Sequence, residues 1–96
     1  SILPSTFELK QNYPNPFNPS TNIDIEIGTA EHIQLTIYDI KGREVITLNN
    51  GFLNIGNHTF KWDGRDKYGQ AVSSGVYIYT LRGSTSIKTN KMLMIK

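Results

Sequence analysis

The amino-acid sequence predicts an all-β domain built as a sandwich of antiparallel sheets. Short segments in which apolar and polar residues alternate recur along the chain, and clusters of glycine, asparagine, proline and serine separate them. Ile33, Ile37 and Ile40 would also fit one face of a helix. We reject that helix because β-branched residues favour strands and Gly42 would interrupt it. The 96 residues suffice for one domain with a modest core.

The first expected strands lie in the N-terminal half of the chain. Apolar and polar residues alternate in residues 7–9 and again in residues 23–27, which is the pattern of half-buried strands. A third strand, residues 33–37, leads into a hairpin at residues 39–42, where we expect Gly42 to adopt a positive φ.

The middle of the chain continues the strand pattern. The return strand of the hairpin is expected at residues 45–48, and asparagine–glycine clusters at residues 49–51 and 54–56 predict turns around a loop. The next strand ends at Trp62. We expect this indole to lie in the core, with its N–H bonded to a backbone carbonyl.

The last elements complete a sandwich. A glycine-punctuated loop, residues 63–75, precedes residues 76–81, which are apolar on both faces and therefore predict a central strand covered on both sides. Residues 87–95 form the final strand. Seven short strands at a spacing of about 8–12 residues indicate an immunoglobulin-like or fibronectin III-like antiparallel β-sandwich. We assign residues 1–6 to a linker remnant and residues 7–96 to the domain.

Residues 12–21, here called the proline loop, form the most distinctive segment. Pro14, Pro16 and Pro19 restrict φ and remove backbone donors, so neither a helix nor a central strand can pass through them. Tyr13 and Phe17 are large apolar groups that a disordered linker would rarely carry. The sequence therefore predicts a stiff loop held to the core by these two aromatic side chains.

Composition and charge limit the possible functions. The chain has no cysteine and no apolar run long enough for a spanning helix, and no signal peptide opens it. Residues 1–50 carry three cations against six acids, residues 51–96 carry seven against two, and no acid follows Arg82. A basic end attracts an acidic receptor, nucleic acid or anionic lipid. Alternatively, the lysines protect an exposed edge strand against aggregation.

No constellation of residues predicts catalysis, a cofactor or a tightly bound metal. His32 and His58 lack a second ligand at useful spacing, and the available serines lie in turns without a nucleophile elbow. Asp63 and Asp66 are weak calcium candidates, because two carboxylates supply part of an oxygen shell. We favour an Asx-turn at Asp63 instead, since this is the common fate of aspartate before glycine.

Several blocks along the chain recur together in one known family. They are Phe7-Glu8-Leu9, residues 11–21, residues 35–45, Gly56-Asn57-His58, Trp62-Asp63-Gly64-Arg65-Asp66 with Gly69, residues 74–81, and Lys91-Met92-Leu93-Met94-Ile95-Lys96. In this order and spacing they resemble the C-terminal sorting domain (type A) of the type IX secretion system. The later blocks also resemble the immunoglobulin-like domain of flagellar hook-capping proteins.

The resemblance implies a non-catalytic address for a larger cargo protein. The expected partners are the outer-membrane translocation and sortase machinery and a cargo domain upstream, with no nucleic acid and a monomeric state. The sortase would remove the domain and attach the cargo to surface lipopolysaccharide. The expected location is the periplasm, in transit to the cell surface or extracellular space, with a signal peptide further upstream. Two alternatives stay open: an immunoglobulin-like scaffold or interaction module, and an accessory carbohydrate-binding domain of a secreted enzyme.

The resemblance also implies roles for particular residues. Those expected to serve recognition are Gly75, Val76, Tyr77, Lys91, Met92, Leu93, Met94, Ile95 and Lys96. Those expected to form a structural motif are Pro14, Asn15, Pro16, Phe17, Trp62, Asp63 and Gly64. The C-terminal segment is mixed apolar and basic, which suits recognition by strand addition. For the carbohydrate alternative, tyrosines 38, 68, 77 and 79 would supply a sugar-stacking surface, although Tyr77 and Tyr79 share a strand face that favours core packing.

Overall fold

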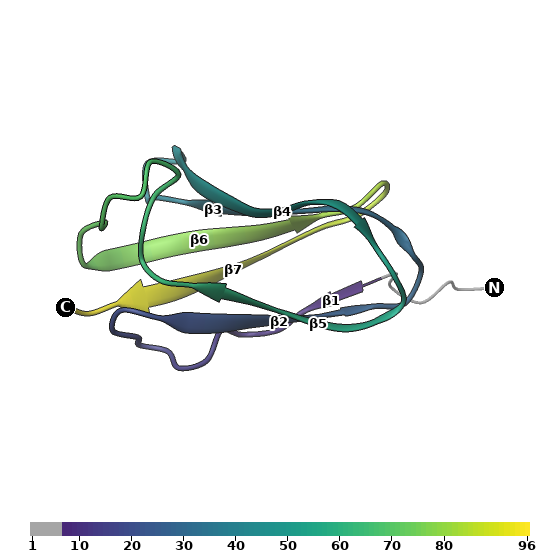
Figure 1. Ribbon diagram of the computed structural model, residues 1–96, viewed down its shortest axis with the longest axis horizontal. Coiled ribbons are helices and arrows are strands. Elements are labelled where there is room, and N and C mark those ends of the chain that lie inside the picture. Colours follow the sequence, from purple (N-terminus) through teal and green to yellow (C-terminus); the bar gives the residue numbers. More distant parts are fainter. Residues whose placement is uncertain (1–6) are drawn as a thin grey trace.

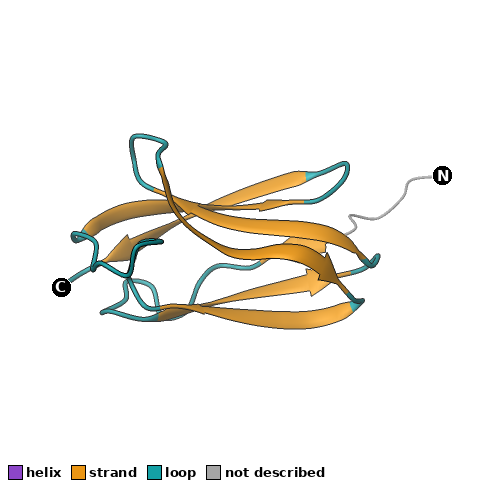
Figure 2. Cartoon of the chain, turned by 45° about the horizontal axis from the view of Figure 1, so that its top comes forward, coloured by secondary structure: helices purple, strands orange, loops and turns teal. Residues whose placement is uncertain are grey.

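A computed structural model of the chain describes residues 7–96, which form two facing antiparallel sheets (Figures 1 and 2). The first sheet has the order β1-β2-β5, with β1 (Phe7–Leu9), β2 (Thr21–Ile27) and β5 (Gly56–Trp62). The second has the order β4-β3-β6-β7, with β3 (Glu31–Tyr38), β4 (Glu44–Leu53), β6 (Gly75–Arg82) and β7 (Ile87–Met94). The predicted seven-stranded sandwich is confirmed. The linker expected at residues 1–6 lies outside the described residues, and within residues 7–96 no helix could span a membrane.

The core lies between the two sheets and follows the predicted alternation. In β2, Ile23, Ile25 and Ile27 are buried while the residues between them are exposed. The second sheet contributes its own inward row, which includes Leu35 and Tyr79, both without exposed surface. Because β2 buries every second side chain, a shift of one residue in its register would place the three isoleucines in solvent. The alternation therefore fixes the register of this strand.

The β3–β4 hairpin forms as predicted, with Gly42 at a φ of 83°. The carboxylate of Asp39 accepts hydrogen bonds from the backbone N–H groups of Lys41 and Arg43, each at 2.9 Å, and from Arg43 Nε. The backbone hydrogen bond from Arg43 is the main cause that lowers the pKa of Asp39 below its ordinary value. The turn is thus closed by a local carboxylate rather than by packing.

The prediction of a loop after residue 48 is wrong, because β4 continues to Leu53. Asn49 Nδ2 donates to the backbone oxygen of Ile33 at 2.9 Å, so the side chain joins the sheet instead of closing a turn. A register shift between Leu35 and Thr36 accommodates the extra residue in β4. Of the two asparagine–glycine clusters, the first therefore lies within the strand.

The prediction that residues 76–81 are covered on both faces is also wrong. Strand β6 does lie between β3 and β7, and its Tyr77 and Leu81 face the core. On the opposite face, however, Val76 is 38% exposed, and no further layer covers this sheet within residues 7–96. Branched side chains favour any pleated strand, so their presence on a face does not require that face to be buried.

Trp62 is the centre of the aromatic packing between the sheets. It is 1% exposed, its ring centroid lies 5.6 Å from that of Phe17, and Tyr77 meets it edge-on at 5.2 Å. Its Nε1 donates to the backbone oxygen of Arg65 at 2.9 Å. Both expectations for this residue, burial and a carbonyl partner, are confirmed.

Trp62→Ala should lower the free energy of unfolding by about 3–5 kcal/mol, because the surrounding residues cannot close a cavity of this size. Phe52→Ala is the matched control: its side chain is 65% exposed, and we expect a change within about 0.5 kcal/mol. Urea denaturation of both variants measures the difference. Equal losses would contradict the central position of Trp62.

Candidate recognition surface at the C-terminal end of the sandwich

The segments expected to carry function meet at one end of the molecule. Figure 1 shows the C-terminus there, at the left, beside the loop that precedes β2 and the loop between β5 and β6. Gly75, Val76 and Tyr77 pair with Met94, Leu93 and Met92, respectively, on the neighbouring strand. The two stretches expected to serve recognition therefore lie side by side, although they are distant in sequence.

Burial divides the expected recognition residues into two groups. Tyr77, Met92 and Met94 are at most 6% exposed and belong to the core. Their side chains support the surface from below, so they are not available to a partner. The exposed members of the set are Val76, Lys91, Leu93, Ile95 and Lys96.

The proline loop pairs with the outer edge of β7. Phe17 N donates to Leu93 O at 3.0 Å, and Ile95 N donates to Phe17 O at 2.9 Å. Leu93 N donates to Asn15 Oδ1 at 3.0 Å, and Gln11 Nε2 donates to Lys91 O at 2.8 Å. The outward backbone groups from Lys91 to Ile95 are thus already bonded. This segment is not the open edge that strand addition requires.

The loop is anchored by Phe17 as predicted, but the prediction for Tyr13 is wrong. Phe17 is 2% exposed, whereas Tyr13 is 78% exposed. The second anchor is Asn12, which is also 2% exposed. Its Nδ2 donates to Thr21 Oγ1 at 2.9 Å and to Pro14 O at 3.2 Å, so a buried amide is satisfied within the loop itself.

The hydroxyl of Tyr79 joins this loop to the central strand β6. It accepts a hydrogen bond from Asn12 N at 2.8 Å and donates to Lys10 O at 2.9 Å. Burial raises the pKa of Tyr79 above its ordinary value of 10.0, which keeps the hydroxyl protonated and able to donate. Reasoning from the sequence missed Asn12 and this partnership. The available signal was an inward-facing tyrosine in an apolar strand, whose hydroxyl needs a partner when buried.

Gly64 allows the β5–β6 loop to pack closely against the same site. Its φ is +76°, and an added Cβ would lie 2.8 Å from Met94 Cε and 3.0 Å from Pro19 O. No other residue fits both the backbone conformation and the space. The structural role expected for Gly64 thus has a physical basis, since this glycine lets the β5–β6 loop, the proline loop and β7 pack together.

The two calcium candidates serve separate turns. Asp63 Oδ1 accepts a hydrogen bond from Arg65 N at 3.2 Å, which is the predicted Asx-turn. Asp66 Oδ1 accepts from the backbone N–H groups of Tyr68 and Gln70, at 2.9 and 3.0 Å. Within the described part of the chain, no group of three or more His, Cys, Asp or Glu residues has the geometry to hold a metal ion.

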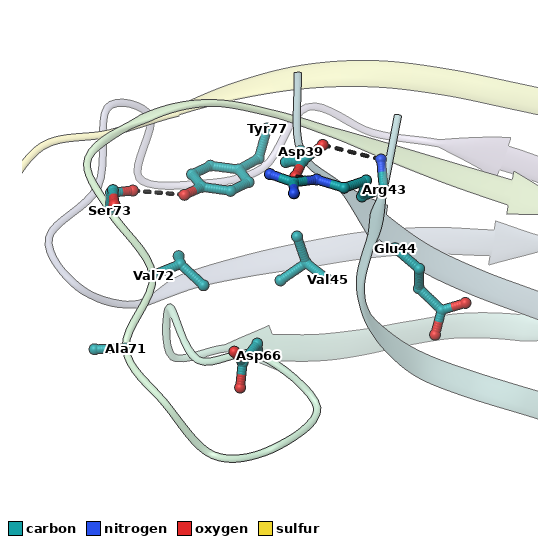
Figure 3. Close-up of a pocket in the computed structure, with 9 residues that line it drawn as sticks. All are labelled: Asp39, Arg43, Glu44, Val45, Asp66, Ala71, Val72, Ser73 and Tyr77. Atoms are coloured by element: carbon teal, nitrogen blue, oxygen red, sulfur yellow. Dashed lines mark hydrogen bonds and ion pairs between the residues drawn. The ribbon is translucent and has the colours of Figure 1, made fainter. Parts of the chain in front are cut away.

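A depression of about 400 Å³ lies between the β3–β4 hairpin and the β5–β6 loop (Figure 3). Asp39 accepts hydrogen bonds from the backbone N and from Nε of Arg43, each at 2.9 Å, and the Tyr77 hydroxyl donates to Ser73 O at 2.6 Å. Figure 3 marks a contact between Asp39 and Arg43 and the one between Tyr77 and Ser73. Burial and, to a lesser degree, the charge of Asp39 raise the pKa of Tyr77. These polar groups satisfy one another, and the arrangement brings no nucleophile to a base.

The two histidines lie on different sheets, and each bonds to an asparagine. His32 bonds to Asn50 Oδ1 at 2.7 Å on the four-stranded sheet, and His58 bonds to Asn54 O at 2.8 Å on the other sheet. Ser74 Oγ instead accepts a hydrogen bond from Lys96 N at 3.0 Å. This contact fixes the end of the C-terminal segment to the start of β6.

Residues 14–86 match the FlgD Ig-like domain family. The chain belongs to this family. It is 42% identical over 55 residues to the basal-body rod modification protein FlgD of Salmonella typhimurium, a match that covers 57% of this chain. The match covers 24% of FlgD, so the chain spans about a quarter of the length of the curated relatives it matches.

Solved structures give the same fold. PorZ of Porphyromonas gingivalis, described as an essential bacterial surface component of the type-IX secretion system, has a TM-score of 0.63 and 25% identity, covering 90% of this chain and 11% of PorZ. Dimeric latent PorU of the same organism has a TM-score of 0.75 and 24% identity over 98% of this chain and 10% of PorU. FlgD of Pseudomonas aeruginosa has a TM-score of 0.61 and 22% identity over 82% of this chain and 66% of that chain. PorU and FlgD, at these identities, support the fold alone.

Tyr79→Phe should lower the free energy of unfolding by about 1–3 kcal/mol, because it leaves the buried backbone N–H of Asn12 without an acceptor. Tyr38→Phe is the matched control, since that hydroxyl has no hydrogen bond among residues 7–96. Chemical denaturation compares the two. If both substitutions cost the same, the Tyr79 hydroxyl does not hold the proline loop in place.

Proposed function

We propose that this chain is the non-catalytic C-terminal sorting domain of a larger cargo protein exported by the type IX secretion system. The observation that carries the proposal is the convergence at one end of the sandwich. There the proline loop, the segment Trp62–Gly64, the start of β6 and the end of β7 form one continuous site. These are the segments that the family resemblance singles out. The similarity to PorZ, a surface component of that secretion system, supports the same function.

The position of the first described strand suits a domain attached behind a cargo. The β6–β7 turn contains Gly83, where an added Cβ would lie 2.6 Å from the ring of Phe7. Phe7 therefore sits at the end of β6 opposite Gly75 (Figure 1). The eight residues of β6 span roughly 26 Å at the usual rise of a strand. A cargo joined before Phe7 would leave the recognition surface uncovered.

This function requires binding alone. The partners would be the outer-membrane translocation machinery and the sortase that releases the cargo, and the domain would act in the periplasm on its way to the cell surface. An upstream signal peptide in the precursor would bring it there.

The alternative is an immunoglobulin-like interaction module, and the family match over residues 14–86 is the observation that favours it. A carbohydrate-binding domain has less support. Tyr77 and Tyr79 are buried in the core, so they cannot contribute to a sugar-stacking surface.

A fusion experiment tests the proposal. The 96 residues are joined to the C-terminus of a reporter with its own signal peptide and expressed in a type IX-competent host. The matched control carries the Ig-like domain of Salmonella typhimurium FlgD at the same place. We expect the reporter on the cell surface only with this chain, measured by protease accessibility in intact cells.

The two outcomes that contradict the proposal are distinct. If neither fusion reaches the surface, the chain is no sorting domain; if both do, the fold rather than this sequence is read. Deletion of residues 91–96 is a poor substitute for this comparison. It removes Met92 and Met94 from the core and would unfold the sandwich.

A further inference from the structure

We infer that the sorting domain docks through the outer face of the β6–β7 hairpin onto a protein surface that has an apolar centre flanked by carboxylates. This face, here called the hairpin face, consists of four cross-strand pairs. They are Val76 with Leu93, Ile78 with Lys91, Thr80 with Thr89, and Arg82 with Ile87. The inference rests on the proposed function, because it names the partner that the function requires.

The pairing places these side chains together and away from the core. Directly opposed residues of an antiparallel pair stand on the same face of the sheet. The intervening residues of β6 and β7, such as Tyr77 and Met92, are buried between the sheets. The hairpin face therefore points outward, and no third sheet or helix covers it within residues 7–96. Neighbouring side chains still bury Thr80 in its middle, which is 9% exposed, so the accessible parts are the two ends of the face.

An apolar centre lies at the C-terminal end of this face. Val76 and Leu93 are 38% and 37% exposed, and Ile95 beyond them is 49% exposed. Together with Asn15, Lys91 and Met92, the Val76–Leu93 pair lines a depression of about 220 Å³. Grouped apolar side chains in a surface depression are typical of a place where a partner inserts an apolar group.

The cations beside this centre are Lys91, which lines the depression, and Lys96, which follows Ile95. Arg82 stands at the other end of β6, next to the β6–β7 turn, where the Glu31 carboxylate accepts hydrogen bonds from Ser84. Neither β6 nor β7 contains an acid, and Arg82, Lys91 and Lys96 have no ion-pair partner within the described residues. Across the sheet from Lys91, the residues in register are Ile78 on β6, Tyr38 on β3 and Glu44 on β4. Glu44, three strands away, is the first acid in this row. Unpaired cations beside an apolar depression favour a partner that supplies carboxylates around an apolar group.

The closed edge of β7 excludes recognition by strand addition. Asn15 and Phe17 already occupy the outward backbone groups around Leu93. A partner must therefore read side chains on the hairpin face instead of adding a strand. Lys91 and Lys96, which the sequence also allows as mere edge protection, then have a partner to contact.

The arrangement favours a protein over an anionic membrane. Stable electrostatic binding to lipid takes a cluster of about 4–8 basic residues. On the hairpin face, Arg82 and Lys91 are separated by the Thr80–Thr89 pair, and each stands beside an apolar residue. Such spaced charges suit paired carboxylates at fixed positions.

Charge reversal in the reporter fusion tests the inference. We expect Lys91→Glu with Lys96→Glu to lower the surface-exposed reporter at least about tenfold, since a glutamate that faces a carboxylate of the partner costs several kcal/mol. The matched control is Lys41→Glu with Lys61→Glu, which makes the same change in net charge at exposed sites off the hairpin face. We expect it to stay within about twofold of the parent fusion. A urea titration of each purified domain verifies folding. If the Glu pair unfolds, Lys91→Gln with Lys96→Gln replaces it, with a smaller loss expected.

The outcomes separate the inference from the function on which it rests. Failure of the parent fusion to reach the surface contradicts the proposed function. Export of the parent and of both reversed variants to the same level overturns the inference and leaves the function standing. A third measurement uses vesicles of phosphatidylglycerol and phosphatidylcholine. Binding to these vesicles that the Lys91–Lys96 reversal abolishes would assign the hairpin face to lipid and contradict a protein partner.

Discussion

The structure depends on one contact between distant parts of the chain, the double hydrogen bond at the Tyr79 hydroxyl. It joins the backbone of Lys10 and Asn12 to the central strand β6, and thereby holds the start of the proline loop against the second sheet. From this point the loop runs along β7 and inserts Phe17 between the sheets. A sandwich has open sides where edge strands expose unpaired backbone groups. Here the chain closes one of those sides with its own N-terminal segment.

This closure connects stability to recognition. Because the edge of β7 is bonded from Lys91 to Ile95, the end of the strand is held in a defined position. The exposed Lys91 and Leu93 are then displayed on a rigid face instead of a fraying end. Rigid presentation lowers the conformational entropy lost when a partner binds. The same contacts that protect the domain against aggregation thus prepare the surface proposed for docking.

Local patterns in the sequence predict much of this fold, and contacts between distant residues account for the rest. The inward row of β2 and the positive φ of Gly42 follow from alternation and turn chemistry, which act over a few residues. Local patterns do not predict the burial of Asn12 or the exposure of Tyr13, because Asn12 N bonds to Tyr79, which is 67 residues away. The family resemblance indicates the segments of the candidate site. Only the strand register shows which of their side chains face outward and which, like Met92, support the core.

Amide hydrogen exchange on the edge of β7 tests the closure of this edge most directly. The N–H groups of Leu93 and Ile95 donate to Asn15 Oδ1 and Phe17 O, whereas alternation turns the Thr89 amide toward the same edge without a comparable partner in residues 7–96. We predict that Leu93 and Ile95 exchange at least about tenfold more slowly than Thr89, and that Asn15→Ala removes the protection of Leu93 alone. Equal exchange at all three amides in the parent chain would contradict the account.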